Sequence, residues 1–199
     1  SLADKIGMLD KIKKIREMTG AGVVEVKKAL DEAAGDETKV LEILKVKSKQ
    51  KASKKAERAA MEGVVISYVH SNGKVGAMVK LYCETDFVAR NEEFKALAQD
   101  IAMHVTAMNP QYVNPEDVPQ EVVDEEKKVW AEQLKNEGKP ENMLEKIMAG
   151  KEKKFREEVA LMSQPFVKNP EQTVAELITE KISKTGENIR VGEFVRFEL

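Results

Sequence analysis

The sequence predicts an α+β protein with a small three-helix N-terminal domain, a basic connector helix and a core in which a three-stranded antiparallel sheet is packed with helices. Three observations predict this class. Apolar residues recur at helical spacing through residues 1–44, the period changes to two from Gly63, and helical spacing returns after Cys83. We expect the three-helix domain at residues 1–46, the connector helix at 47–62 and the core at 63–199.

The N-terminal region is expected to form three short helices separated by glycine-containing turns. Gly20-Ala21-Gly22 ends the first helix, Gly35 ends the second, and Asp36 is placed to cap the third. Residues 45–60 then lose the apolar period, which is typical of an exposed connector. The apolar stripes of the three helices consist, in order, of Met8, Leu9, Ile12 and Ile15; of Val23, Val26, Ala29, Leu30 and Ala33; and of Val40, Leu41 and Leu44.

The core is expected to begin with a β-hairpin. Residues 64–70 and 74–83 alternate between the two faces of a strand, and they flank Asn72-Gly73, a pair that favours the positive φ angles of a tight turn. The alternation returns at residues 189–199. We therefore predict that a third strand joins the hairpin.

Helices are expected to fill the rest of the core. An amphipathic pattern from Phe94 to Met108 is broad enough to cover one face of a sheet, and a proline-rich loop follows at residues 110–119. Further helices are predicted at about residues 120–137, 141–149, 151–163 and 172–185. Their predicted boundaries are Pro140 at a start, and Gly150, Pro165 and Gly186 at ends.

Composition excludes several classes of protein. The chain has 199 residues, a net charge of −2 and a single cysteine, so it can form no intrachain disulfide and has no cysteine cluster for zinc. It contains no apolar run long enough to span a membrane, and its start lacks the features of a secretion signal. We expect a soluble protein in a reducing compartment, the cytoplasm, or an organellar matrix or stroma if a transit segment has been removed.

The residues that usually carry catalysis are scarce. His70 and His104 have no nucleophile or carboxylate partner at a recognisable spacing, and we expect both to be surface or boundary residues. Cys83 ends a strand and is expected to be a small buried side chain. Gly20-Ala21-Gly22 is not followed by the Lys-Ser/Thr pair of a phosphate-binding loop. The sequence therefore predicts no enzyme, no metal and no cofactor.

Basic residues are concentrated in the N-terminal third, which is net positive, while the rest of the chain is net negative. One interpretation is a module that binds RNA or the ribosome. The other is a solvated connector helix, which the acidic pI of about 5.9 and the lack of interleaved aromatic residues favour. The run comprises Lys39, Lys45, Lys47, Lys49, Lys51, Lys54, Lys55 and Arg58.

The segment from Glu84 to Asn91 is unusual, because apolar Phe87 and Val88 occupy a place where a polar turn is expected. In one interpretation Phe87 folds back as a hydrophobic staple at a helix entrance that Asn91 caps. In the other, Phe87 stands on a rigid corner and anchors a partner protein, with Asp86 beside it to compete for polar groups of that partner. Composition alone favours the staple, a pattern that is common in soluble domains.

Several blocks of the sequence resemble the elongation factor Ts family. The two main blocks are Thr85-Asp-Phe-Val-Ala-Arg-Asn-Glu-Glu-Phe94 and Thr19-Gly-Ala-Gly-Val-Val-Glu-Val-Lys-Lys-Ala-Leu30. Shorter matches occur in the same order along nearly the whole chain, and this makes the resemblance specific. They are His70-Ser-Asn-Gly-Lys-Val-Gly76, Gly138-Lys-Pro-Glu-Asn142, Glu145-Lys-Ile147, Gln164-Pro-Phe-Val-Lys168 and Gly186-Glu-Asn-Ile189.

The resemblance implies a ubiquitin-associated-like N-terminal domain and a function as a guanine-nucleotide exchange factor for the GTPase elongation factor Tu. It implies that Asp86 and Phe87, completed by Thr85 and Val88, press into the GTPase and disturb its Mg²⁺ and phosphate binding. It also implies a second docking surface, around Val23, Val24, Lys27 and Lys28.

The resemblance is to the short form of the family, because this chain holds one copy of a core that longer members carry twice. It therefore implies a homodimer, and a three-stranded sheet with an exposed edge also favours pairing. No specific nucleic acid and no membrane is expected as a partner. Where many members have Met-Met and then Cys in the N-terminal block, this chain has the shorter apolar residues Val23, Val24 and Val26.

Overall fold

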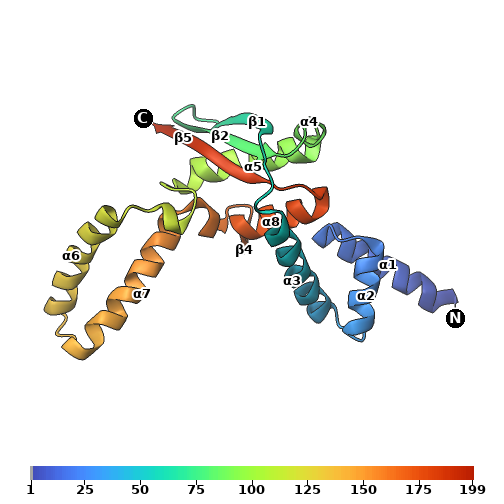
Figure 1. Cartoon of the computed structure of the whole chain (residues 1–199), viewed down its shortest axis with the longest axis horizontal. Helices are drawn as coiled ribbons and strands as arrows, with labels where there is room; N and C mark the ends of the chain where they lie inside the picture. Colours follow the sequence, from blue (N-terminus) through green and yellow to red (C-terminus); the bar gives the residue numbers. More distant parts are fainter. Residues whose placement is uncertain (1) are drawn as a thin grey trace. The chain divides into compact units, whose positions relative to one another are not determined.

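The structure is a computed structural model and describes residues 2–199. The N-terminal part consists of α1 (Leu2–Thr19), α2 (Val23–Glu32) and α3 (Glu37–Lys55), which pack on one another around a shared apolar core (Figure 1). Gly20 has a φ of +69° at the end of α1, as expected for a residue that lets the chain leave a helix. The Asp36 side chain accepts hydrogen bonds from the backbone N–H groups of Thr38 and Lys39, which confirms the predicted N-cap.

Helix α3 continues without a break from the three-helix packing into the basic connector. The division expected at residue 46 therefore falls inside a helix, and the division of the chain into domains stays a prediction. The first turns of α3 bury Val40 and Leu44, whereas Ala52 is the one buried residue of its later turns. The helix ends at Lys55, so the connector helix predicted at 47–62 is wrong for its last residues, and the helical part has little packing of its own.

The sheet has the order β1-β2-β5, with β1 at Glu62–Val69, β2 at Val75–Cys83 and β5 at Arg190–Glu198. The strands are antiparallel, and the α+β fold class is confirmed. The hairpin between β1 and β2 is confirmed, and Gly73 in its turn has a φ of +66°. Asn72 does not share the positive φ; its side-chain oxygen accepts the backbone N–H of Lys74 instead. Alternate residues of β2 are buried, namely Ala77, Val79, Leu81 and Cys83.

Helix α5 (Glu92–Met108) covers one face of this sheet, as its apolar stripe predicts (Figure 1). Along it Leu97, Ala98, Ile101, Ala102 and Val105 are all buried. At the end of the helix, Arg196 of β5 donates from Nε to the backbone oxygen of Thr106 at 3.0 Å. The core of this part of the chain therefore lies between α5 and the sheet.

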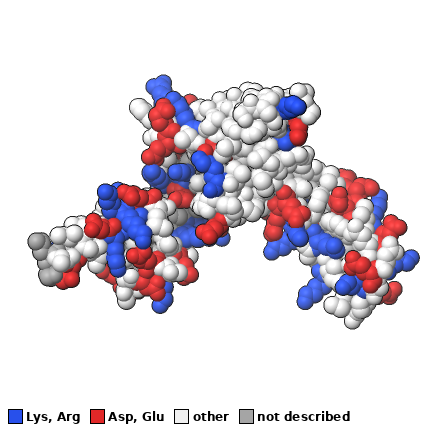
Figure 2. Space-filling model, turned by 180° about the vertical axis from the view of Figure 1, so that it is seen from behind, with Lys and Arg blue, Asp and Glu red and all other residues white. Residues whose placement is uncertain are grey.

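Helices α6 (Gln120–Asn136) and α7 (Glu141–Val159) form a helical hairpin on which charges of both signs are interspersed (Figures 1 and 2). The predicted break at Gly150 is wrong, because α7 runs straight through this residue. A glycine inside a helix costs only about 1 kcal/mol, so neighbouring contacts can outweigh it. Such contacts follow it in α7: Phe155 packs edge-on against Trp130, and Glu152 pairs with Lys127.

Three short elements are absent from the sequence prediction. Strands β3 (Pro165–Phe166) and β4 (Asn169–Thr173) form a second, two-stranded sheet before α8 (Val174–Thr185), and a four-residue helix, α4 (Asp86–Ala89), follows β2. Two single turns of 3₁₀ helix, at Pro115–Asp117 and Leu161–Ser163, complete the chain. Elements this short carry too few residues to display a period.

The chain forms two compact units. One contains the N-terminal residues up to Val64 together with Leu81–Lys95 and Glu176–Arg190, so it holds both sequence blocks that carry the main family resemblance. The other contains Val65–Lys80, Ala96–Ala175 and Val191–Leu199, and so holds the helical hairpin and most of the sheet.

Candidate partner-docking site

The first candidate surface is the corner between β2 and α5, which α4 forms. Thr85 caps α4, because its Oγ1 accepts the backbone N–H of Val88 at 3.4 Å. Phe87 lies in the single turn that follows, and its side chain is 80% exposed. Asp86 pairs with Arg90 at 3.2 Å on the surface of the same turn. The corner therefore presents an aromatic ring to solvent between charged neighbours.

The position of Phe87 excludes one of the two interpretations of this segment, and the other stays a prediction. A hydrophobic staple requires a packed side chain, so an exposed fraction of 80% makes the staple wrong for Phe87. The capping part of that interpretation is confirmed, since Asn91 Oδ1 accepts the backbone N–H of Glu93 at 2.7 Å at the start of α5. The ring is thus exposed on a turn that Thr85 caps at its start, and Asn91 caps the helix that follows.

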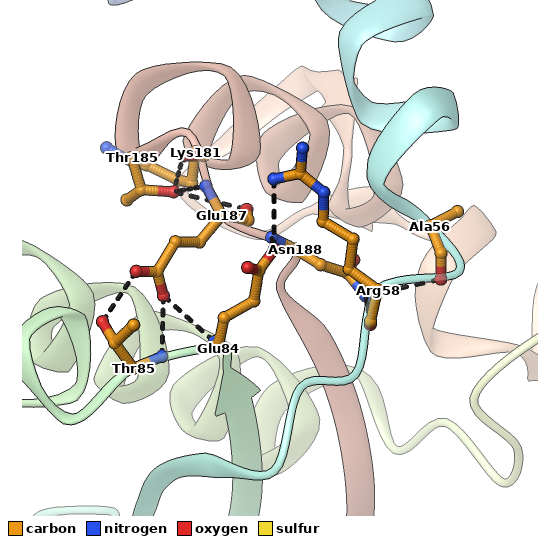
Figure 3. A network of polar contacts seen from close by, with 8 residues as sticks. All are labelled: Ala56, Arg58, Glu84, Thr85, Lys181, Thr185, Glu187 and Asn188. Carbon is orange, nitrogen blue, oxygen red and sulfur yellow. Dashed lines mark hydrogen bonds and ion pairs between the residues drawn. The ribbon is translucent and has the colours of Figure 1, made fainter.

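The corner is held by a carboxylate from the far end of the sequence (Figure 3). Glu187, in the loop after α8, accepts the backbone N–H groups of Glu84 and Thr85 on Oε1, at 3.0 and 2.9 Å. Its Oε2 accepts the hydroxyl of Thr85 at 2.7 Å. Three hydrogen bonds to one ionised group fix the residue that begins the corner.

A reciprocal set of bonds ties the same loop back to β2 and to the end of the connector (Figure 3). Glu84 accepts the backbone N–H of Asn188 at 2.7 Å, and Arg58 lies 3.7 Å from the same carboxylate oxygen. The Asn188 side chain donates to the backbone oxygens of Arg58 and Ala56. The sequence alone does not mark Glu187 as a site residue. Its only signal is the short match Gly186-Glu-Asn-Ile189, which does not indicate what the carboxylate contacts.

Cys83 lies directly beneath the corner and is buried, as predicted. Its thiol donates to the backbone oxygen of Thr85 at 3.2 Å. Burial, together with the negative charge of Glu187, raises the pKa of the Cys83 thiol to about 11. At neutral pH the group is therefore a protonated thiol and a poor nucleophile.

The second candidate surface is the start of α2. Val26, Ala29 and Leu30 point into the three-helix core and are buried. The predicted apolar stripe is wrong for Val23, which is 46% exposed. Val24, at 67%, and Lys27 and Lys28 are exposed with it. The four residues that the resemblance places in a docking surface are therefore all accessible.

Lys184 of α8 touches elements that belong to both surfaces. Its aliphatic stem passes so close to Gly20 that a β-carbon there would lie 3.3 Å from the lysine, and its ammonium pairs with Glu93 of α5 at 2.8 Å. The hydrogen bond from Lys184 lowers the pKa of the Glu93 carboxyl. The turn before α2 and the start of α5 are thus joined through one side chain.

The basic run is partly neutralised within the chain. Lys45, Lys47, Lys51 and Arg58 pair with Glu176, Glu32, Glu25 and Glu84, at N–O distances between 2.8 and 3.8 Å. Lys and Arg side chains on these helices are interspersed with Asp and Glu (Figure 2). This arrangement favours the solvated connector over a nucleic-acid interface, which needs a continuous basic face.

The two histidines differ in their exposure to solvent. His70 is exposed, as expected, and lies 3.2 Å from the hydroxyl of Tyr68. The expectation of a surface or boundary position is wrong for His104, which is completely buried. Its Nδ1 accepts the backbone N–H of Val167 and its Nε2 lies 2.9 Å from Oε1 of Gln164, so both ring nitrogens are satisfied by groups that lie about 60 residues away in the sequence.

Across residues 2–199 the structure shows no group of three or more His, Cys, Asp or Glu side chains arranged to hold a metal ion. None of the helices in this range is long and apolar enough to cross a membrane. What the fold does offer is an exposed aromatic side chain on a braced corner and an exposed apolar helix start. These features are typical of a protein that binds another protein.

Comparison with known sequences identifies the family. A sequence model described as Elongation factor TS matches residues 6–199. Elongation factor Ts of Carboxydothermus hydrogenoformans is 53% identical over 94% of this chain and 87% of its own length, and that of Thermodesulfovibrio yellowstonii is 53% identical over 94% of both. Elongation factor Ts of Thermotoga neapolitana is 51% identical over 96% of both chains. The chain belongs to the elongation factor Ts family and is thus a translation elongation factor.

Proposed function

We propose that this chain is the guanine-nucleotide exchange factor of elongation factor Tu. It binds the GDP-bound GTPase, displaces Mg²⁺ and GDP, and stabilises the nucleotide-free GTPase until GTP binds. It makes and breaks no covalent bond itself. The observation that carries the proposal is the 80% exposure of Phe87 on a capped corner, in the sequence block that resembles the family's GTPase-contacting motif.

The energetic basis is linkage between two ligands of one GTPase. When a factor binds the nucleotide-free form more tightly than the GDP-bound form, it lowers the affinity of the GTPase for GDP. GDP lowers the affinity for the factor by the same ratio. A coupling of about 4 kcal/mol corresponds to roughly a thousandfold change in affinity. In the free protein the ring of Phe87 lies in water, so burying it in the partner is favourable. In this proposal the ring can be buried only when the nucleotide pocket is distorted, and its burial therefore supplies part of the coupling energy.

The corner and the start of α2 have different roles in this proposal. Val23, Val24, Lys27 and Lys28 dock on the GTPase and hold it. Thr85, Asp86, Phe87 and Val88 act on the nucleotide site and dislocate Mg²⁺. Both surfaces belong to the same compact unit, which supports their use on one partner.

The outer face of the sheet supports a homodimer. Lys80 of β2 pairs with Glu193 of β5 at 2.8 Å, so Met78 and Val195, two residues along each strand, lie opposite one another on the same face. Met78 and Val195 are each 49% exposed, and Phe197 is 77% exposed. An apolar face of this kind is a better candidate for association than the exposed edge that the sequence suggests, because burying it removes apolar surface from water. We propose a second copy of this chain as its occupant.

Bacterial relatives and a translation partner support the cytoplasm as the place of action. No nucleic acid is required by the proposal, and the internal ion pairs of the connector reduce the charge that it can offer to one.

The proposal is tested by stopped-flow fluorescence. Elongation factor Tu carrying a fluorescent GDP is mixed with excess unlabelled GDP, with or without a catalytic amount of this protein. The proposal predicts that the factor accelerates release of the fluorescent nucleotide and that each molecule of factor serves many molecules of GTPase. An unchanged release rate with a folded preparation would contradict it.

A further inference from the structure

Phe87 has very little of its own to hold it in place. Helix α4 has only four residues, which is far too short to be stable by itself. The ring is 80% exposed, so its packing cannot fix the turn, and the Asp86–Arg90 pair lies on the surface, where such pairs contribute little. Ala89 is the buried residue of the turn, so the direction in which the ring points depends on that contact and on the backbone at the start of the turn.

That backbone is fixed by Glu187. Its carboxylate receives the N–H groups of Glu84 and Thr85 and the hydroxyl of Thr85, at 2.7 to 3.0 Å, and all three are charge-assisted hydrogen bonds. The same Thr85 hydroxyl oxygen accepts the N–H of Val88 in the next turn of chain. Bonds thus run from the carboxylate to Thr85 (Figure 3), and from Thr85 to the residue after Phe87.

Glu187 is itself held firmly enough to serve as a support. Its backbone N–H donates to the hydroxyl of Thr185 at the end of α8, and that hydroxyl donates to the backbone oxygen of Lys181. The next residue, Asn188, is buried and bonded to Glu84 and Arg58. The loop is therefore anchored on both sides of the carboxylate.

We propose that Glu187 is a positioning residue for nucleotide exchange: its carboxylate holds the corner at Thr85 so that Phe87 is presented to the GTPase in the orientation that the partner must receive. This inference rests on the proposed function. Pre-ordering the corner removes the entropy cost of arranging it during binding. Glu187 touches neither nucleotide nor GTPase in this account and acts only through the corner.

Two substitutions separate the parts of this role. Glu187→Ala removes all three acceptor contacts. Glu187→Gln removes the charge but keeps one oxygen that can accept the two backbone N–H groups. Glu125→Ala, which removes an exposed glutamate paired with Lys128 on α6, serves as the control for loss of a surface carboxylate.

The first readout is the rate of fluorescent GDP release as a function of factor concentration. We expect Glu187→Ala to lower the maximal rate by about tenfold, which corresponds to the loss of one or two net hydrogen bonds. The half-saturating concentration stays within about twofold of wild type, because the start of α2 still docks. Glu187→Gln retains more than half of the maximal rate, and Glu125→Ala is unchanged. A merely structural role would lower the amount of active protein and leave the rate per folded molecule unaltered.

A double-mutant cycle shows whether the effect passes through Phe87. If Glu187 only positions this ring, Glu187→Ala has no further effect in a Phe87→Ala background. An equal loss of rate in both backgrounds would mean that Glu187 acts elsewhere and would overturn the proposal.

The second readout is independent of exchange and uses the single cysteine of the chain. Cys83 is buried under the corner and bonded to Thr85, so its reaction with 5,5′-dithiobis(2-nitrobenzoic acid) reports opening of the corner. Loss of the Glu187 charge also makes the thiol more reactive, and Glu187→Gln measures that effect alone. We expect Glu187→Ala to react at least about tenfold faster than Glu187→Gln under conditions where circular dichroism shows both folded.

The outcomes distinguish this inference from the proposed function. If Phe87→Ala slows exchange but Glu187→Ala does not, the positioning role is wrong and the exchange function stands. If Phe87→Ala leaves exchange unaltered, the proposed function is wrong, and the thiol reaction still reports whether Glu187 holds the corner. Equal thiol reactivity in the Ala and Gln variants, or a Gln variant as slow in exchange as the Ala variant, would overturn the hydrogen-bonding role.

Discussion

Buried His104 makes the stability of the protein depend on pH in a defined direction. The ring is completely buried and lies against Phe166, with 6.0 Å between the ring centroids. Because Nδ1 accepts the N–H of Val167, the proton of the neutral ring lies on Nε2 and is donated to Gln164. A second proton, on Nδ1, would place this N–H opposite the N–H of Val167, so that two donors would face each other in the core.

The size of the effect follows from proton linkage. Burial lowers the pKa of His104 below its ordinary value of 6.5, although the hydrogen bond to Gln164 acts in the opposite direction. As pH falls through 6.5, His104 therefore takes up a proton in the unfolded chain but stays neutral in the folded chain, and the free energy of unfolding decreases. Between pH 7.5 and 5.5 this loss amounts to at most about 1.4 kcal/mol. Four glutamates whose pKa is lowered by basic neighbours lose their contributions only below about pH 4.5, outside this window; they are Glu37, Glu93, Glu152 and Glu193.

Urea denaturation at pH 7.5 and 5.5, followed by circular dichroism, measures this difference. The chain offers a matched control, because its only other histidine, His70, is exposed. Wild type and His70→Gln are expected to lose about 1 kcal/mol between the two pH values, whereas His104→Gln loses less than about 0.3 kcal/mol from its lower starting stability. An equal loss in His104→Gln and wild type would refute the assignment of the pH dependence to this ring.

Three further predictions concern the rest of the fold. Gly63→Ala should prevent stable folding or lower the free energy of unfolding in urea by more than about 3 kcal/mol. The reason is that Gly63 has a φ of +153° and a β-carbon there would strike a backbone carbonyl. Gly73→Ala is the control: this residue has a φ of +66° and open space around it, so the substitution should lower the free energy of unfolding by about 1 kcal/mol. Asp36→Ala should lower the free energy of unfolding by about 1 kcal/mol through loss of the α3 N-cap, and a change under about 0.3 kcal/mol would contradict the cap. Phe197→Asp should convert the proposed dimer to a monomer in sedimentation velocity with an unchanged circular dichroism spectrum, and a dimer that persists would exclude this sheet face as the interface.

Much of the fold could be predicted because its main elements display their own period. Asn72-Gly73 marks the hairpin and Asp36 the start of α3, since both act through bonds to residues two or three positions away. Gly150 misled the prediction because a glycine signals a helix end only when tertiary contacts do not continue the helix, and Phe155 and Trp130 continue it here. A periodic pattern contains no information on such contacts.

The candidate site could be predicted only in part, for the same reason. Apolar residues in a polar setting and the family resemblance both mark the exposed corner, so the sequence indicates Phe87. Glu187 is about 100 residues from Thr85 in sequence, and an isolated glutamate between Gly186 and Asn188 resembles any surface carboxylate. His104 was misplaced similarly, because the groups that satisfy its ring, Gln164 and Val167, come from a short β-sheet region that no pattern predicts.

The central claim is that the exposed ring of Phe87 drives nucleotide release from elongation factor Tu, and one comparison tests it most directly. Phe87→Ala and Met61→Ala remove side chains of nearly equal exposure, 80% and 82%, in the same compact unit, so both should leave folding intact. Release of fluorescent GDP at saturating factor should be at least about thirtyfold slower with Phe87→Ala, as expected for an interface residue worth 2 kcal/mol or more, and unchanged with Met61→Ala. A Phe87→Ala variant that is folded and exchanges nucleotide as fast as wild type would contradict the account.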